Sequence, residues 1–209
     1  MSSEEKIQND KRAHILDVAE YLFAHQGFEA VSIREISKAA DINIAMVSYY
    51  FGSKEKLYEA VVTRKLISSE LILHHIERYN CSKDKLFVIV DLLTDKFFEH
   101  RNMQTIIFRE MAMEQRTAMA ELIANQLHQN FTIINDVIQK GIKQKEFKKV
   151  DVELTVMTII GIVKIYTTSS PVVCKVLKTE DKELMFSKQY KLRLKKYLKE
   201  LLTNHLGIK

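Results

Sequence analysis

The chain has 209 residues, a formal net charge of +5, only five glycines and one proline, a composition that favours long helices over a turn-rich β architecture. The first ten residues are polar, and no stretch reaches the roughly 20 apolar residues of a membrane-spanning helix. Cys81 and Cys174 lie far apart without metal-type spacing, which argues against a zinc site or a disulfide framework. We therefore expect an all-α, cytoplasmic protein of at most two domains.

The charge is unevenly distributed along the chain. Residues 1–65 contain nine Lys and Arg against ten Asp and Glu, a balance of −1, whereas the remaining residues contain 23 against 17, a balance of +6. A positive net charge permits binding to nucleic acid but does not locate a site. DNA binding must therefore be inferred from local sequence patterns.

A first amphipathic helix is predicted over residues 11–26. Its apolar residues Ile15, Ala19, Leu22 and Phe23 recur at i, i+4, i+7 and i+8, the spacing of one helix face. Gly27 then follows as a residue that accepts the left-handed conformation, and Phe28 is placed to pack against Phe23. The first helix is thus expected to end sharply at this glycine.

Two short helices are predicted next. Ser32-Ile33-Arg34-Glu35 has the form of a capping box, which places a helix start at Ile33. Asp41 tolerates the left-handed conformation of a tight turn, and Asn43 can cap a third helix over residues 44–50. Two short helices with this connection are typical of a helix-turn-helix, whose second helix enters the DNA major groove. A plain helical corner is the structural alternative.

The two sides of the predicted third helix differ in composition. Ile36, Ile42, Val47 and Phe51 are spaced to form a small core with the first helix. The other side presents Ala45, Met46, Ser48 and Tyr49, with Tyr50 beside them. Small, hydroxyl and aromatic side chains can approach base edges and phosphates. Ser53-Lys54 opens the following helix, where a lysine and free backbone amides can meet a phosphate.

Three stretches resemble the N-terminal signature of TetR-type regulators: Gly27-Phe28, residues 31–40 and residues 45–57. The resemblance extends over roughly residues 11–62. It implies a homodimeric, ligand-responsive DNA-binding regulator with about nine helices. Residues 1–52 would form the helix-turn-helix domain, and residues 53–209 a helical body for ligand sensing and dimerisation.

The resemblance also implies roles for individual residues. Ser32, Tyr49, Tyr50 and Lys54 would contact phosphates, Arg34 would read a base or a phosphate, and Ala45, Met46 and Ser48 would face the groove. The full set of expected DNA-binding residues is Ser32, Arg34, Asn43, Ile44, Ala45, Met46, Ser48, Tyr49, Tyr50 and Lys54. The chain departs from the family pattern at Ile44, Ser48 and Asp41, where lysine, tyrosine and glycine are common.

The rest of the chain is predicted to be helical. The expected helices span residues 54–78, 83–100 behind a Ser82 cap, 103–113, 118–140, 152–168 behind an Asp151 cap, and 180–205, with an interruption at Pro171. The helix over residues 54–78 is expected to join the two domains rigidly. Ligand binding would favour a spacing of the two recognition helices that no longer fits successive major grooves, so that DNA is released. The helix over residues 54–78 would transmit this change.

The body contains candidates for an effector pocket and a dimer interface. Adaptable apolar groups suit a pocket for a hydrophobic ligand, although such residues also form ordinary core. The expected pocket residues are Phe97, Phe98, Phe108, Met111, Gln126, Phe131 and Tyr166. In the last helix Tyr190, Leu194, Tyr197 and Leu201 are spaced for a helix–helix seam, which suits either a subunit interface or an intramolecular contact. In the resembled family, the last two helices of each subunit form the dimer interface.

The sequence gives little support for a metalloprotein or an enzyme. His74, His75, Glu77 and His100 could suggest a metal site, but adjacent histidines on a helix point about 100° apart, unlike an i, i+4 ligand pair. No GxSxG, Walker or GxGxxG motif is present. We therefore expect no metal, no cofactor and no catalysis. The rival hypothesis is a helical enzyme or partner-binding adaptor that keeps the helix-turn-helix as a structural element.

Overall fold

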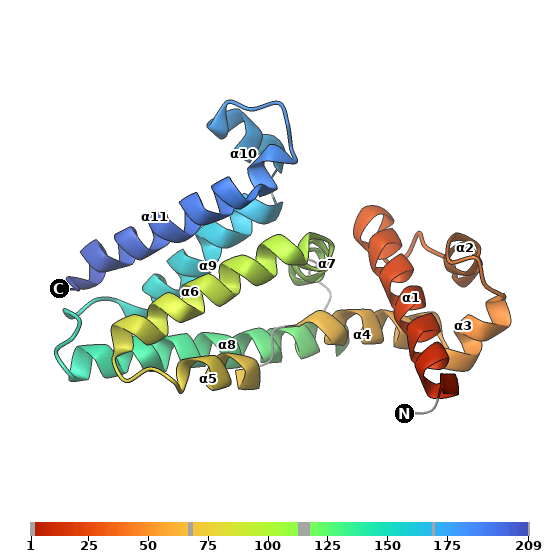
Figure 1. The fold of residues 1–209 in the computed structure, drawn as a ribbon, viewed down its shortest axis with the longest axis horizontal. Helices are drawn as coiled ribbons and strands as arrows, with labels where there is room; N and C mark the ends of the chain where they lie inside the picture. Colours follow the sequence, from red (N-terminus) through yellow and green to blue (C-terminus); the bar gives the residue numbers. More distant parts are fainter. Residues whose placement is uncertain (1–2, 67–68, 113–117, 169, 209) are drawn as a thin grey trace. The chain divides into compact units, whose positions relative to one another are not determined.

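The computed structural model describes residues 3–66, 69–112, 118–168 and 170–208. Within these ranges it contains eleven α-helices and one 3-10 helix, and no strand (Figure 1). The all-α class predicted from the sequence is confirmed. Contacts divide the chain into two compact units: residues 1–66 with 105–121, and residues 67–104 with 122–209. The first unit therefore extends beyond the domain boundary expected at residue 52.

The first unit is built around its N-terminal helix. Its helices are α1 (Ser3–Gln26), α2 (Ile33–Ala39), α3 (Ile44–Phe51), α4 (Lys54–Lys65) and the C-terminal part of α7 (Arg101–Ala112). Helix α1 packs on α2 and α4, and α2 packs on α3. The core includes Ile15, Ile36, Val47 and Leu57, which are almost inaccessible to solvent. Burying side chains of this size contributes about 1.5–3 kcal/mol each to stability.

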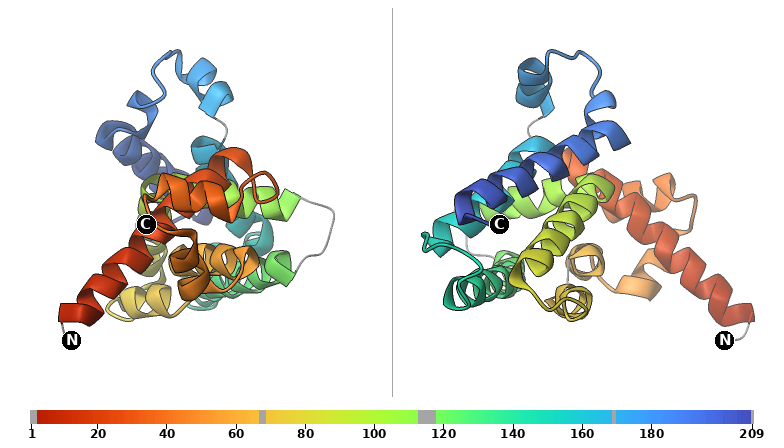
Figure 2. Two further views of the ribbon diagram at one scale, coloured as in Figure 1. Left: turned by 90° about the vertical axis from the view of Figure 1, so that its right-hand side faces the viewer. Right: turned by 60° about the vertical axis from the view of Figure 1, so that its left-hand side comes forward.

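The second unit contains the remaining helices. They are α5 (Ser69–Ile76), α6 (Ser82–Glu99), α8 (Ala118–Lys143), α9 (Val152–Thr168), α10 (Ser170–Leu177), the 3-10 helix (Leu184–Phe186) and α11 (Lys188–Leu206). Helix α6 is central, because α5, α9 and α11 all pack against it (Figure 2). Three lysines of α11 also pair with two aspartates of α6. Burial disfavours ionised Asp95, but hydrogen bonds from Lys195 and Lys191 outweigh this effect and lower the pKa of the carboxyl.

The expected long helix over residues 54–78 is wrong. Helix α4 ends at Lys65, Leu66 is extended with ψ at 132°, and α5 begins at Ser69. The apolar pattern continues through the break, so periodicity alone gave no sign of it. Two shorter helices therefore replace the single rod that was expected to transmit the ligand signal.

The segment around Pro171 also differs from the prediction. Helix α9 ends at Thr168, and a further helix, α10, begins at Ser170 with Pro171 in its first turn. Proline fits the first turn, because its missing N–H would have no helical acceptor there. The last helix starts at Lys188, after a 3-10 helix, and Ser187 caps it. The extra helix and the divided fourth helix account for eleven α-helices instead of about nine.

Most of the other predicted helices agree closely with the structure, but α1 begins at Ser3, eight residues before the predicted start at Lys11. Helix α9 has the predicted bounds, and the Asp151 carboxylate accepts the Leu154 amide at 3.0 Å. Helix α6 starts one residue early, with Cys81 as its cap instead of Ser82; the predicted end of α7 at Met113 lies outside the described residues. None of the described helices is by itself long and apolar enough to cross a membrane; Val152–Thr168 and Pro171–Leu177 together reach that length and composition, but are bent by 97°.

Candidate nucleic-acid interface

Local hydrogen bonds fix the turn between α2 and α3. The Ser32 hydroxyl accepts the Glu35 amide at 3.1 Å, and the Asn43 side chain accepts the Ala45 amide at 2.8 Å. Asp41 adopts the predicted left-handed conformation, with φ at 52°. The second half of the capping box does not form as predicted, because the Glu35 carboxylate accepts Gln26 Nε2 at 2.8 Å. The two caps and the turn together set the direction of α3.

Helix α3 has one buried and one exposed side. Val47 and Phe51 are 1% and 7% exposed and belong to the core of the first unit. On the opposite side Tyr49 is 76% exposed and Ile44 48% exposed. Ala45, Ser48 and the cap Asn43 are also exposed, whereas Met46, Tyr50 and the predicted core residue Ile42 are half-buried. The face that the sequence assigned to DNA is therefore accessible on a helix that is anchored from behind.

Lys54 and Ser32 already have partners in the free protein. The Lys54 ammonium lies 4.3 Å from the centre of the Phe28 ring and donates to the Glu29 carbonyl at 3.4 Å. A lysine ammonium has three donors, so this contact leaves others for a phosphate. The Ser32 hydroxyl serves as the α2 cap. Arg34 is exposed at the start of the same helix.

Ion pairs neutralise part of the acidic charge of the first unit. Arg64 binds Asp17 at 2.6 Å and Glu20 at 3.1 Å, and Lys65 binds Glu20 at 2.9 Å. Among the described residues 8–65, the other Lys and Arg side chains form no ion pair. They are Lys11, Arg12, Arg34, Lys38, Lys54 and Lys56. The slightly negative net charge of residues 1–65 therefore does not prevent a local positive potential beside α3.

Two of these cations were missed by sequence reasoning. Arg12 of α1 and Lys56 of α4 line a hollow of about 350 Å³ together with Tyr50 and Phe51 at the end of α3. The Arg12 guanidinium carbon lies 5.3 Å from the centre of the Phe51 ring. Nearby, the Gln8 amide donates to the Tyr49 hydroxyl at 3.4 Å. The N-terminal half of α1 meets α3 only in the folded chain, so no local motif reports this proximity.

The residues predicted for an effector pocket fall into several places. Phe97 and Phe98 are buried in the second unit, and Phe98 stacks on Tyr166 with ring centroids 5.6 Å apart. Burial is the main cause that raises the pKa of Tyr166 to about 12. Phe131 lines a separate hollow of about 320 Å³ with His128 and Asn135 among others. Gln126 donates to Gln129 at 3.3 Å, and Phe108 and Met111 belong to the first unit.

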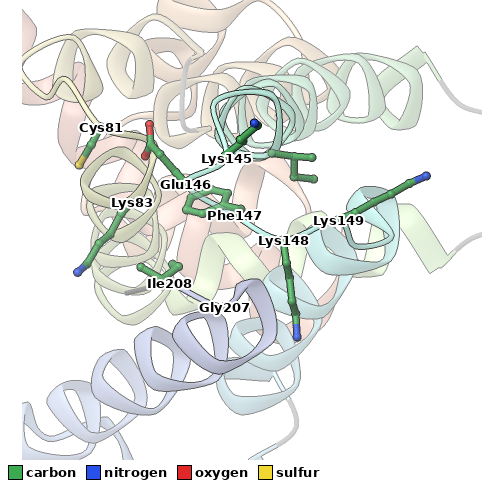
Figure 3. Close-up of a pocket in the computed structure, with 10 residues that line it drawn as sticks. Cys81, Lys83, Lys145, Glu146, Phe147, Lys148, Lys149, Gly207 and Ile208 are labelled. Atoms are coloured by element: carbon green, nitrogen blue, oxygen red, sulfur yellow. The ribbon is translucent and has the colours of Figure 1, made fainter.

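A basic hollow of about 680 Å³ lies beside the loop between α8 and α9 (Figure 3). Phe147 is one of the residues that line it, and the Phe147 ring would lie 2.3 Å from a Cβ atom added to Gly141. The Glu146 carboxylate accepts a hydrogen bond from the Ser82 amide at 2.7 Å, which satisfies a backbone N–H at the N-terminus of α6. The side chains of Lys83, Lys148 and Lys149 point in different directions in Figure 3. The lysines therefore do not form a convergent site for a small anion.

The predicted interface residues of α11 differ in their exposure to solvent. Leu194 is 6% exposed and is buried within the chain, as are Leu198 and Leu202, on a helix whose lysines pair with the aspartates of α6. For Leu194 the burial supports the intramolecular alternative that the sequence left open for this seam. Tyr197 is exposed, and Tyr190 and Leu201 are half-buried.

The histidines of α5 have ordinary structural partners. His74 accepts from Arg78 at 3.3 Å, and His75 lies 2.7 Å from the Leu71 carbonyl. No three His, Cys, Asp or Glu side chains gather at a metal-binding distance in the part of the chain that the structure describes.

Known proteins are similar to this chain in both sequence and fold. Residues 15–61 match the family described as bacterial regulatory proteins of the tetR family, and residues 80–168 match the tetracyclin repressor-like C-terminal domain. Over 191 residues the chain is 25% identical to the "Probable HTH-type transcriptional regulator YttP" of Bacillus subtilis, with 90% of this chain and 91% of the relative covered. The repressor KstR2 of Mycobacterium tuberculosis is 26% identical over 152 residues, which cover 70% of this chain and 74% of KstR2.

A solved structure extends this similarity. The crystal structure of the hemolysin II transcriptional regulator HlyIIR superposes with a TM-score of 0.66 at 26% identity, covering 92% of this chain and 98% of that chain. The N-terminal match coincides with the helices that present α3. The chain belongs to the TetR family of bacterial transcriptional regulators.

Proposed function

We propose that the protein is a cytoplasmic repressor that binds a palindromic operator as a homodimer and is released by a small-molecule inducer, without catalysing a reaction. The observation that carries the proposal is the exposed face of α3 around Tyr49, held on a buried core. The repressor names of KstR2 and of other relatives support the sign of regulation. Selection of bound sequences from random DNA, repeated with candidate inducers, tests the proposal. Enrichment of a palindrome supports it, and no enrichment contradicts it.

Exposed apolar side chains on α9 support a homodimer. Leu154, Met157 and Ile165 are 60%, 57% and 55% exposed, and they share one helix face with Gly161. A Cβ atom added to Gly161 would meet no atom within 4 Å, so a second helix could approach closely there. Because each of these side chains is a little over half exposed, burying the rest of it would contribute about half of the roughly 1.5–3 kcal/mol of complete burial.

We assign the partner surface to this α9 face together with Tyr197, Tyr190 and Leu201 of α11, without Leu194. Met157→Asp with Ile165→Asp should produce monomers, because the introduced charges would have to be desolvated in an apolar interface. Leu194→Asp is the matched comparison and should unfold the subunit instead. Sedimentation together with circular dichroism separates these results, and a stable dimer of the first double variant would refute the surface.

The effector site is proposed in the second unit near the stacked rings of Phe98 and Tyr166. Phe97, which precedes Phe98 in the sequence, is also buried. The Tyr166 hydroxyl donates to the Met185 carbonyl at 3.0 Å. An aromatic lining of this kind suits a largely apolar ligand with few polar groups. Phe98→Ala should weaken inducer binding while leaving operator affinity intact in protein that remains folded. Unchanged inducer affinity of the folded variant would exclude this position.

Helix α7 is proposed as the element that transmits the effector signal. It begins at Arg101 in the second unit, and its residues from Thr105 onward belong to the first unit. There Arg109 donates to the Phe23 and Ala24 carbonyls at 3.0 and 3.2 Å. The Glu110 carboxylate accepts the Tyr58 hydroxyl at 2.7 Å. These bonds hold α7 to α1 and α4, which carry the recognition module, and replace the single long helix expected from the sequence.

A further inference from the structure

We propose that the hollow lined by Arg12, Tyr50 and Lys56 binds a phosphate of the DNA backbone and clamps the C-terminal end of α3. This inference rests on the proposed DNA-binding function and adds two residues to its contact surface. Arg12 comes from α1, Tyr50 from α3 and Lys56 from α4, so three elements of the first unit contribute to one hollow of about 350 Å³.

The chemistry of the lining matches a phosphate. Arg12 and Lys56 are both exposed, and neither forms an ion pair within the described residues. The Phe51 ring, 5.3 Å from the Arg12 guanidinium carbon, holds the cation by a cation–π contact without neutralising its charge. A guanidinium fork is well suited to phosphate oxygens. The Tyr50 hydroxyl adds a neutral donor.

The position of the hollow relative to α3 favours DNA as the source of that phosphate. A helix about 10–12 Å in diameter fills a major groove about 12 Å wide, so phosphates flank it on both sides. Lys54 and Ser32 mark one set of predicted backbone contacts. The hollow lies at the C-terminal end of α3, next to exposed Tyr49 and to its contact with Gln8. A second backbone contact there would fix the register of the recognition helix.

One residue of the lining opposes an anion. Among the described residues that line the hollow, Glu59 alone contributes a carboxylate. The Thr63 hydroxyl donates to the Glu59 backbone carbonyl. Removing this negative charge should therefore strengthen phosphate binding. Glu59→Gln and the cation substitutions consequently act in opposite directions, which a general loss of folding cannot imitate.

The test compares Arg12→Ala with Lys56→Ala, alone and combined, against Lys11→Ala as a matched control. Lys11 is the neighbouring exposed cation on α1 but does not line the hollow. Fluorescence anisotropy would measure binding to a selected operator and to an unrelated duplex at several salt concentrations. Arg12→Lys keeps the charge and should retain most of the affinity. Thermal melts identify any variant that fails to fold, and Lys56→Ala removes only an exposed side chain.

Each phosphate contact contributes about 0.9 to the slope of log affinity against log salt, so losing one contact per half-site of a dimer should reduce the slope by about 1.8. The ratio of wild-type to variant affinity then shrinks about twelvefold between about 50 and 200 mM salt. The loss should be equal for both duplexes, because backbone contacts do not specify sequence. Glu59→Gln should bind more tightly than wild type.

An unchanged slope in the double variant, or an equal loss in Lys11→Ala, would overturn the phosphate clamp. A loss confined to the selected operator would indicate base reading and would also overturn it. If the wild-type protein enriched no sequence, the proposed repressor function would fail. The slope on the unrelated duplex would still decide whether the hollow binds backbone phosphate.

Discussion

Tyr58→Phe tests the buried contact that joins α4 to α7. Tyr58 and Glu110 are 6% and 7% exposed, and the hydroxyl donates to the carboxylate at 2.7 Å. A hydrogen bond to a charged group contributes about 1.5–3 kcal/mol, and its loss leaves a buried carboxylate without this donor. For a chain of this size the melting temperature should fall by roughly 3–12 °C.

A double-mutant cycle with Glu110→Gln isolates the pair. The two substitutions remove the same charged hydrogen bond, so their effects should be non-additive by about 0.5–3 kcal/mol. Chemical denaturation monitored by circular dichroism would provide the free energies of unfolding. All variants are compared at one protein concentration, because the proposed dimerisation would contribute to stability. If Tyr58→Phe lowered the free energy of unfolding by less than about 0.5 kcal/mol and the two substitutions acted additively, the stabilising role of this hydrogen bond would be refuted.

The same pair gives a prediction for alkaline pH. Burial, and then the hydrogen bond to Glu110, raise the pKa of Tyr58 well above its ordinary value of 10.0. Unfolding at higher pH exposes a hydroxyl that ionises, so the unfolded state binds fewer protons than the folded state. The contribution of Tyr58 to stability is therefore complete below pH 10 and is lost as the pH rises further. Tyr58→Phe should show a shallower decline above pH 10, and an unchanged pH dependence would contradict the assignment.

Three further substitutions have distinct expected outcomes. Gly141→Ala would place a Cβ atom 2.3 Å from the Phe147 ring and should lower the free energy of unfolding by about 1–3 kcal/mol in a chemical denaturation. Its matched control is Gly161→Ala, which has open space around it. This control should leave the subunit stable but weaken the proposed dimer in sedimentation. Arg109→Ala should lower the melting temperature and also reduce the effect of inducer on operator affinity, and an unchanged response would exclude α7 as transmitter. Met46→Ala should change which sequences are enriched from random DNA, whereas Lys54→Ala should lower affinity for all of them.

Local signals made the first unit predictable from the sequence. Gly27, Asn43 and Ser53 each act within four residues along the chain, and the structure confirms the helix boundaries that they predicted. Gly27 adopts a φ of 89° and its amide bonds to the Phe23 carbonyl at 2.9 Å. Such interactions depend on neighbouring residues alone, so a single sequence is sufficient to infer them.

Features that depend on tertiary contacts could not be predicted in the same way. The apolar pattern that runs through Leu66 gave no indication of the break after α4. Leu194 fits two possible stripes on α11, and only the pairing of Lys195 and Lys199 with α6 decides which stripe is buried. Arg12 meets the end of α3 across about 40 residues of intervening sequence in the folded chain only.

Methylation interference on the selected operator tests most directly whether a dimer reads the major groove through α3, because guanine N7 lies in that groove. We predict that N7 methylation blocks binding at two clusters of guanines whose centres are separated by about 10–10.5 base pairs or a multiple of that distance. Met46→Ala should change the interference pattern within each cluster. Binding that tolerates methylation of every major-groove guanine in a guanine-containing operator, or a single cluster without a symmetric partner, would contradict a dimer that reads DNA through α3.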